Sequence, residues 1–221
     1  MDKIIEKYTA VPNHDLIISK DVAYQADMSN PVPYDKAYFD KYVNYEDTQI
    51  SRELNTGRYT ITNKYILSKH FKYNICDIGI GSGEFIKQWY PKHIYGYDIN
   101  PEGVKWLKER GIYEDYFKIY RILTFWDSLE HMENPGEILE QVQEGSYIIV
   151  SIPIFEDLAK VRESKHYRPN EHFYYFTEKG LINWLKEYGF ELVEKSDFEI
   201  KSGREDIYTF VFRKTILESE E

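Results

Sequence analysis

One stretch decides the fold of this chain: Asn74-Ile75-Cys76-Asp77-Ile78-Gly79-Ile80-Gly81-Ser82-Gly83-Glu84-Phe85. An apolar strand runs into three closely spaced glycines, and a helix follows. Glycine tolerates positive φ and brings no Cβ, so the backbone of such a turn can approach a ligand closely. The helix behind the turn presents free backbone N–H groups at its first residues. The stretch therefore predicts a strand–turn–helix unit that binds a nucleotide-like ligand.

The glycine spacing departs from the dinucleotide-binding pattern G-x-G-x-x-G. Gly83 comes one residue early, and Glu84 stands where that pattern needs Gly or Ala. Asp77 ends the strand just before the turn, where a carboxylate would repel a pyrophosphate but would suit an ammonium group. These departures favour the methionyl part of S-adenosylmethionine as the ligand, with Gly79, Gly81 and Gly83 as its backbone cradle.

A second carboxylate supports the same ligand. Asp98 comes 21 residues after Asp77, at the tip of an apolar strand over residues 93–97, and Ile99 follows it. An acid at this position can accept hydrogen bonds from both hydroxyls of a ribose. Either acid alone could be a helix N-cap. The two in this register, with the glycines between them, favour cofactor binding by Asp77, Asp98 and Ile99.

Strands and helices alternate along the rest of the chain. We expect a helix over 47–71, interrupted near Gly57, and further helices over 84–90, 101–110, 135–142 and 177–188. We expect strands over 73–78, 93–97, 120–126, 147–152, 190–198 and 207–213. Alternation of this kind implies an α/β fold, with a mostly parallel sheet covered on both faces. The last two strands, joined at Ser202-Gly203, must be antiparallel because a parallel pair needs a long crossover.

Composition bounds the domain organisation and the partners. The 221 residues carry a formal net charge of -10 and a single cysteine, so no internal disulfide is possible. With no long apolar run, we expect a cytoplasmic protein that does not enter a membrane. The net negative charge disfavours non-specific binding to duplex DNA. The 21 tyrosines could offer stacking surfaces, so nucleic acid stays an alternative methyl acceptor. We divide the chain into an irregular N-terminal arm or cap (1–50), a main domain (51–214) and an acidic tail (215–221).

Further motifs connect the chain to a known family. They are Y-G-Y-D-I-N-P (95–101), W-D-S-L-E-H-M-E-N-P (126–135), H-F-Y-Y-F-T-x-x-G-L (172–181) and Y-G-F-E-L-V (188–193). With D-I-G-I-G-S-G (77–83), the chain resembles the class I S-adenosylmethionine-dependent methyltransferases over about residues 50–200, and locally the group of the ubiquinone-biosynthesis O-methyltransferases. The resemblance implies a Rossmann-like, doubly wound, mostly parallel seven-stranded sheet with an antiparallel C-terminal strand. It also implies methyl transfer from S-adenosylmethionine to an oxygen or nitrogen atom.

The resemblance also assigns cofactor contacts. Arg58, in the helix before the glycine turn, is similar to an arginine that grips the methionine carboxylate; the alternative is an ordinary surface arginine. Phe125 and Trp126 are similar to residues that wall the methionine and adenine side; the alternative is core packing. The third strand of the family, over residues 111–118, is short and polar here. We choose Asp115, and next Glu114, as the carboxylate for the adenine amino group.

A D-x-x-E-H cluster follows the strand over 120–126. Asp127 can meet both Glu130 and His131 on one face of a helix, and His172 follows the next strand. The four side chains could bind Mg²⁺, Mn²⁺ or Zn²⁺, as a similar arrangement does in some relatives that methylate catechol-like rings or RNA 2′-hydroxyls. Alternatively, His131, Glu130 or Asp127 is a general base without a metal, or His131 is structural. The sequence leaves all three hypotheses open: a metal site, a general base without a metal, and a structural role for His131.

The methyl acceptor is less defined. The insertion over residues 155–171 contains Lys160, Arg162, Lys165, His166 and Arg168, and it should cover the acceptor together with the N-terminal arm. The charges of this insertion favour an anionic small molecule as the methyl acceptor. The alternative is that the insertion is an ordinary solvated loop that does not contact the acceptor. We keep two other functions: a non-catalytic scaffold or partner protein of the same fold, and a nucleic-acid methyltransferase. The early third glycine argues against a nicotinamide-dependent oxidoreductase.

Overall fold

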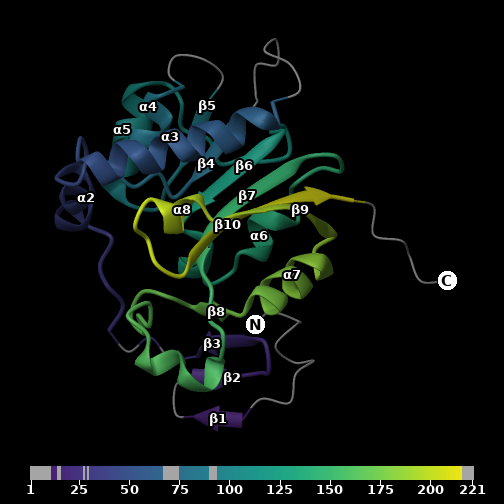
Figure 1. Ribbon diagram of the computed structural model, residues 1–221. Helices are drawn as coiled ribbons and strands as arrows, with labels where there is room; N and C mark the ends of the chain where they lie inside the picture. Colours follow the sequence, from purple (N-terminus) through teal and green to yellow (C-terminus); the bar gives the residue numbers. More distant parts are fainter. Residues whose placement is uncertain are drawn as a thin grey trace.

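The computed structural model describes residues 11–13, 16–26, 28, 30–66, 75–89 and 94–215. In these residues the main sheet has six strands in the order β5-β4-β6-β7-β10-β9 (Figure 1). The strands are β4 (Ile75–Ile78), β5 (Ile94–Tyr97), β6 (Ile122–Trp126), β7 (Tyr147–Pro153), β9 (Phe190–Ser196) and β10 (Ile207–Lys214). The first four are parallel, and β10 is antiparallel to both β7 and β9. The expected α/β architecture with an antiparallel C-terminal strand is confirmed.

Helices cover both faces of this sheet (Figure 1). They are α3 (Gln49–Lys64), α4 (Glu84–Lys87), α5 (Pro101–Glu109), α6 (Gly136–Leu139), α7 (Glu178–Glu187) and the short α8 (Phe198–Lys201). One core cluster joins α3, α4 and α5 to the sheet through residues such as Ile61, Phe85 and Leu107. The other joins α6 and α7 through residues such as Leu139 and Trp184. This doubly wound arrangement brings the carboxyl ends of β4, β5 and β6 to one edge, where ligands of such sheets bind.

The seventh strand that the family resemblance implied is reduced to a single bridge between Gly96 and Tyr113. The chain turns away immediately afterwards, because one carboxylate oxygen of Glu114 accepts hydrogen bonds from the backbone N–H groups of Asp115 and Tyr116, both at 3.0 Å. Side-chain hydrogen bonds of this kind compete with the ladder of a sheet. The described residues therefore give six strands where seven were expected.

The N-terminal arm is more regular than expected. It supplies β1 (Val11–Asn13), β2 (Leu16–Ile18) and β3 (Val22–Gln25) to a second, antiparallel sheet whose fourth strand is β8 (Tyr174–Phe176). This sheet lies below the main one in Figure 1. Its small core joins Leu16 of the arm to Phe155 and Tyr175. The arm thus pairs with β8 and packs against the insertion that precedes it, and α2 (Lys36–Val43) leads from the arm to α3.

Two local expectations differ from the structure, and a third falls almost entirely outside the described residues. Helix α3 continues through Gly57, where a Cβ would stand 2.4 Å from Cδ2 of Phe198, so this glycine admits a close neighbour instead of ending the helix. The connection between β9 and β10 contains α8 and not only a turn. All but the first residue of the predicted acidic tail lies outside the described residues. Within the described residues, no helix has both the length and the apolarity to span a membrane.

Candidate active site

The glycine turn at the end of β4 has the geometry that its sequence predicts. Gly79, Gly81 and Gly83 all have positive φ, at 78°, 56° and 77°. The Gly83 N–H closes the turn on the carbonyl of Ile80 at 2.8 Å. A Cβ at Gly79 would lie 2.6 Å from Cβ of Ser128, and one at Gly83 would lie 2.8 Å from the Trp106 ring. Only glycine fits these two positions, so the turn is a close backbone cradle.

Asp98 follows β5 directly and lies beside the glycine turn. Its carboxylate accepts a hydrogen bond from the Asn100 N–H at 2.7 Å and is 9% exposed. Burial raises the pKa of Asp98, while hydrogen bonds from backbone N–H groups, including those of Ile80 and Gly81, act in the opposite direction. Asp98 is therefore fixed beside the glycine turn with part of its carboxylate open to the cavity, as a ribose contact requires.

Asp77 lies at the base of the cradle. The Thr124 hydroxyl donates to its Oδ1 at 2.7 Å, and only 1% of the residue is exposed. Burial raises the pKa of Asp77 to about 7, against the hydrogen bond from Thr124 and the charge of Arg58. A buried carboxylate with so high a pKa is stabilised in its charged form by a nearby cation. The ammonium group of a methionyl moiety is such a cation, so the residues present fit S-adenosylmethionine.

A cavity of about 1120 Å³ joins this cradle to the predicted acid and histidine cluster. Gly79, Gly81, Asp98 and Ile99 line one part of it, and Glu130, His131 and His172 line another. The chain segments 28–45 and 165–173 contribute further wall residues. The arm and the insertion after β7 thus cover the cavity, as expected.

Three tyrosines of the arm border this cavity. The Tyr42 ring approaches the position of a Gly81 Cβ to 3.7 Å. Tyr34 packs edge-on against Tyr38 with ring centroids 4.9 Å apart, and the hydroxyls of Tyr38 and Tyr42 are 3.1 Å apart. Sequence reasoning missed these residues individually, although their four-residue spacing in and beside α2 was a usable signal.

The arm is also bound to the residues that follow β5. Asn100 Nδ2 donates to the Asp35 carbonyl at 2.9 Å, and Asp35 caps α2 by accepting from the Tyr38 N–H at 3.0 Å. Asn100 is itself the N-cap of α5. The start of the covering helix is therefore bound to the residue two positions after Asp98.

Glu130, His131 and His172 meet at the other part of the cavity. One potential ligand atom from each lies within 4.8 Å of the others, and the two imidazole centroids are 4.5 Å apart. Glu130 is 1% exposed, and neither of its carboxylate oxygens has a hydrogen-bond partner among the described residues. Such a group is costly to bury alone. The Tyr34 hydroxyl lies 3.2 Å from Nδ1 of His131, so the arm reaches this cluster.

Burial sets the protonation of this cluster. It lowers the pKa of His131 to about 4 and also lowers that of His172, so both rings are neutral at pH 7. It raises the pKa of Glu130 well above the usual range, and the charge of Asp127 adds to this. Neutral imidazoles beside a carboxyl group can exchange a proton or offer lone pairs to a cation.

Asp127 is not part of this cluster. Arg204 binds its carboxylate bidentately, at 2.7 Å and 2.9 Å, and Arg58 Nη2 lies 3.3 Å from the same group. Burial alone would raise the pKa of Asp127, but the two arginines bring it below its ordinary value. The structure thus brings together three of the four predicted metal ligands and pairs the fourth with arginines, which also makes Asp127 a poor base.

The remaining predicted cofactor residues divide into two groups. Arg58, Trp126 and Ile99 line the cavity, with the Arg58 guanidinium 5.0 Å above the Trp126 ring. Phe125 is fully buried in the core cluster on the α6–α7 side of the sheet, because alternate residues of β6 point to opposite faces. Asp115 is exposed, and it is not among the residues that line the cavity. The structure therefore does not bring Phe125 or Asp115 to the predicted cofactor site.

Two further functional candidates lie between β9 and β10. Glu199 of α8 is fully buried and contacts Arg58, and Arg204 follows α8 and lines the cavity. In the sequence they stand in a charged connection that predicts only a turn. Their position depends on the pairing of β10 with β7, which brings this connection back over the carboxyl end of β6.

The sequence profile of a methyltransferase domain family matches residues 41–195. The chain belongs to this family. The match covers the glycine turn, Asp98, the Glu130–His131–His172 cluster and α7. With the doubly wound sheet, it establishes a class I S-adenosylmethionine-dependent methyltransferase; it does not distinguish a subgroup of that class.

Solved structures share the fold at low sequence identity. The magnesium protoporphyrin IX methyltransferase of Synechocystis PCC 6803, with bound SAH, is 14% identical, with a TM-score of 0.55 over 81% of this chain and 95% of that chain. The 1,6-didemethyltoxoflavin-N1-methyltransferase of Burkholderia thailandensis is 15% identical, with a TM-score of 0.54 over 93% and 98% of the two chains. The cyclase SpnF is 13% identical, with a TM-score of 0.54 over 73% and 81%.

Proposed function

We propose that this methyltransferase moves the methyl group of S-adenosylmethionine to an oxygen or nitrogen atom of a small molecule. The observation that carries the proposal is the single cavity of about 1120 Å³ that contains both the glycine cradle and the Glu130–His131–His172 cluster. Pockets for one small ligand commonly measure about 300–1,000 Å³. The cavity is therefore large enough for a donor and a small acceptor together.

The chain's own residues would divide the work between donor and acceptor. Asp77 and Arg58 face the charged groups of the methionyl part, and Asp98 faces the ribose. S-adenosylmethionine supplies an activated methyl group, whose bond to sulfur breaks as the bond to the acceptor forms, so positioning is the protein's main task. The proton that the acceptor loses would pass to the Glu130–His131 pair. Asp127 is unsuited to receive it because Arg204 stabilises its carboxylate.

A divalent metal at this cluster remains a proposal. Glu130, His131 and His172 would hold it, and the buried, unpartnered carboxylate of Glu130 supports the fit. Two imidazoles and one carboxylate suit Mn²⁺ or Zn²⁺ better than Mg²⁺, which prefers oxygen ligands. A metal there would polarise an acceptor hydroxyl. Activity that survives complete chelation, without stimulation by added Mn²⁺, would rule this out.

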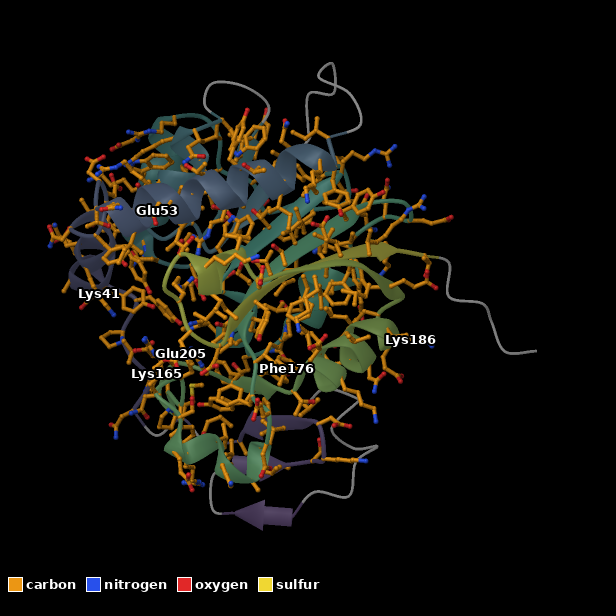
Figure 2. The ribbon with its side chains drawn as sticks, viewed as in Figure 1. Lys41, Glu53, Lys165, Phe176, Lys186 and Glu205 are labelled. Atoms are coloured by element: carbon orange, nitrogen blue, oxygen red, sulfur yellow. The ribbon has the colours of Figure 1, made fainter. Side chains whose placement is uncertain are left out.

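The charges of the insertion give limited support for an anionic acceptor. Lys165 and Arg168 line the cavity, but each is paired with a carboxylate: Lys165 with Glu205 and Arg168 with Glu171, the latter at 2.9 Å. Figure 2 shows Lys165 and Glu205 side by side. Arg162 is not among the lining residues, and its guanidinium lies 5.6 Å from the Tyr167 ring. Lys165 and Arg168 therefore stay candidate contacts for an anionic group, and we test Arg168, whose guanidinium has donors beyond the one paired with Glu171.

The deciding experiment follows a labelled methyl group. The purified protein and S-[methyl-³H]adenosylmethionine are incubated with a cell extract that has been separated into small-molecule, nucleic-acid and protein fractions. We expect transfer into the small-molecule fraction. Transfer only into nucleic acid would replace the proposed acceptor class by the alternative. Absence of both cofactor binding and transfer would favour a scaffold or partner protein.

Binding and transfer need separate measurement. One structural neighbour is called a cyclase, so this fold occurs with another named activity. Calorimetry with S-adenosylhomocysteine tests the donor site alone. Two predictions stay untested: the resemblance to the ubiquinone-biosynthesis O-methyltransferases and the cytoplasmic location. An acceptor with a hydroxylated ring would support the resemblance to that group.

A further inference from the structure

Four side chains form a closed ring of ion pairs in the wall of the cavity. Arg58 Nε donates to Glu199 Oε1 at 3.2 Å, and Arg58 Nη2 donates to Asp127 Oδ2 at 3.3 Å. Arg204 joins the same two carboxylates, with Nη1 2.5 Å from Glu199 Oε2 and 2.7 Å from Asp127 Oδ2. Two positive and two negative charges make this ring neutral. We call it the Arg58–Asp127–Arg204–Glu199 ring.

The ring fastens the β9–β10 connection to α3. Arg58 belongs to α3 and Asp127 follows β6, whereas Glu199 and Arg204 come from α8 and the residues after it. The Phe198 ring fills the space where a side chain at Gly57 would stand, which brings α8 against α3. The Arg204 N–H donates to the Glu199 carbonyl at 2.9 Å, so the two ring members are also tied by backbone.

This arrangement fixes the orientation of one guanidinium. Arg58 is held at Nε by Glu199, at Nη2 by Asp127, and on its face by the Trp126 ring at 5.0 Å. Its Nη1 has no hydrogen-bond partner among the described residues, and Arg58 lines the same cavity as Asp77. A planar guanidinium that is anchored at two edges keeps its remaining donors pointing in one direction.

Arg204 also sets the sign of the local charge. Without it, Asp127 and Glu199 would outnumber Arg58, and a net negative charge would face any anionic group beside Arg58. With it, the ring is neutral and the remaining N–H donors of Arg58 can attract a carboxylate. Charges at such short range are screened little in a partly buried wall; Glu199 is 0% exposed, and the side chains of Arg58, Asp127 and Arg204 are 14%, 27% and 24% exposed.

We propose that Glu199 and Arg204 are positioning residues that hold Arg58 so that its Nη1 binds the methionyl carboxylate of the donor. The proposal rests on the proposed function, because it requires S-adenosylmethionine as the donor. It assigns a role to the β9–β10 connection, which contributes no group to the glycine turn or to the histidine cluster.

Two ligands separate this role from a general effect on the site. S-adenosylhomocysteine carries the amino and carboxylate groups, whereas 5′-methylthioadenosine keeps the adenosine and sulfur but lacks both. Their dissociation constants are measured by calorimetry for the wild type, Glu199→Gln, Arg204→Lys and the control Lys201→Gln. Lys201 is an exposed residue of the same helix, paired with Asp197 at 2.7 Å. Thermal unfolding of each variant checks that it is folded.

We expect Glu199→Gln to weaken S-adenosylhomocysteine binding about tenfold, the usual effect of disturbing one charge-assisted hydrogen bond. The looser hold on Arg58 Nε should outweigh the net positive charge that this substitution leaves in the ring. The affinity for 5′-methylthioadenosine should change less than about twofold, because that ligand cannot contact Arg58 through a carboxylate. Arg204→Lys keeps the neutral ring and should cause a smaller loss. Lys201→Gln should leave both dissociation constants unchanged.

Other outcomes are equally informative. If the wild type binds neither ligand, the proposed function itself fails. If the wild type binds both ligands and Glu199→Gln weakens both equally, weakens neither, or tightens the binding of S-adenosylhomocysteine, the function stands and the positioning role is overturned. If Glu199→Gln does not fold, Glu199→Asp keeps the charge but shortens the side chain, and the same selective loss of S-adenosylhomocysteine is required of it.

Discussion

The two parts of the cavity are built in different ways. The donor part is built mainly from residues 77–100, and Tyr42, Trp106 and Ser128 pack against its glycines. The acceptor part combines Tyr34 of the arm, Glu130 and His131 after β6, and His172 before β8. The first takes most of its groups from one short stretch of chain. The second exists only once two sheets have paired, so its geometry depends on the whole fold.

The largest effect should follow from damage to the local part. Gly79→Ala places a side chain at φ 78° and 2.6 Å from Cβ of Ser128. Strain of this kind costs about 1–3 kcal/mol, and the clash displaces the turn that holds the donor. We expect at least a hundredfold loss of S-adenosylhomocysteine affinity by calorimetry.

Gly111→Ala is the matched control for this change. Gly111 has φ 65°, but nothing lies within 4 Å of its added Cβ. It should lower the stability by about 1 kcal/mol through backbone strain alone and leave the cofactor affinity unchanged. Equal affinity losses in the two variants would mean that backbone strain, and not the shape of the cradle, explains the effect.

This contrast explains what could be predicted from the sequence. Asp77, the glycines and Asp98 lie together as the sequence predicts, because strand, turn and helix fix their relative positions within one βαβ unit. Their contacts with the cofactor stay a prediction. Asp115 does not line the cavity, because Glu114 ends the third strand after one bridge. Phe125 lies in the core and not at the cavity, because alternate residues of β6 point to opposite faces and Trp126 is the one that faces the cavity.

Residues from distant segments needed the structure. Tyr34 reaches His131 because β3 pairs with β8, a contact between residues about 150 positions apart that leaves no local pattern. The separation of Asp127 from Glu130 also could not be read from their spacing. It arises because Asp127 adopts φ 54° and turns to Arg204, whose position depends on β10.

Removing one charge from the acceptor part should reduce turnover and preserve donor binding. Glu130→Gln keeps the shape of a side chain that is 1% exposed but removes its ability to hold a proton or a cation. Loss of a general base or acid commonly lowers the rate by about 10²–10⁴-fold. We expect a fall of about a hundredfold in methyl transfer to the active fraction, with an unchanged dissociation constant for S-adenosylhomocysteine.

Glu144→Gln supplies the control, since Glu144 is exposed and outside the cavity lining. It should alter neither quantity. A Glu130→Gln protein that transfers methyl groups at the wild-type rate would remove this residue from the chemistry. It would leave the cluster as a structural feature.

The acceptor part should also make stability depend on pH. The pKa of His131 is lowered to about 4 in the folded protein, so between about pH 6.5 and 4 the unfolded chain binds more protons than the folded one. This contribution to stability is complete above pH 6.5 and is lost as the pH falls, up to about 3 kcal/mol. Asp77, with its raised pKa, acts in the opposite direction.

The measurement is therefore a difference between two proteins. Thermal unfolding from pH 7 to 4.5 is compared for the wild type and His131→Asn, which retains Asp77. We expect the wild type to lose more stability over this range than the variant does. Parallel curves would contradict the lowered pKa of His131.

The smallest effect should come from the rim of the acceptor part. Arg168 lines the cavity and pairs with Glu171, whereas Arg162 does not line it. If the acceptor is anionic, Arg168→Glu should raise the half-saturating amount of the active fraction several-fold, because it replaces an exposed attraction of about 1 kcal/mol by a repulsion. Arg162→Glu introduces the same charge change outside the cavity wall and should have no comparable effect.

Equal effects of both variants would indicate long-range electrostatic attraction instead of contact, and raised salt would then abolish these effects. No effect of either would favour a neutral or cationic acceptor, which the paired state of the lining cations also allows.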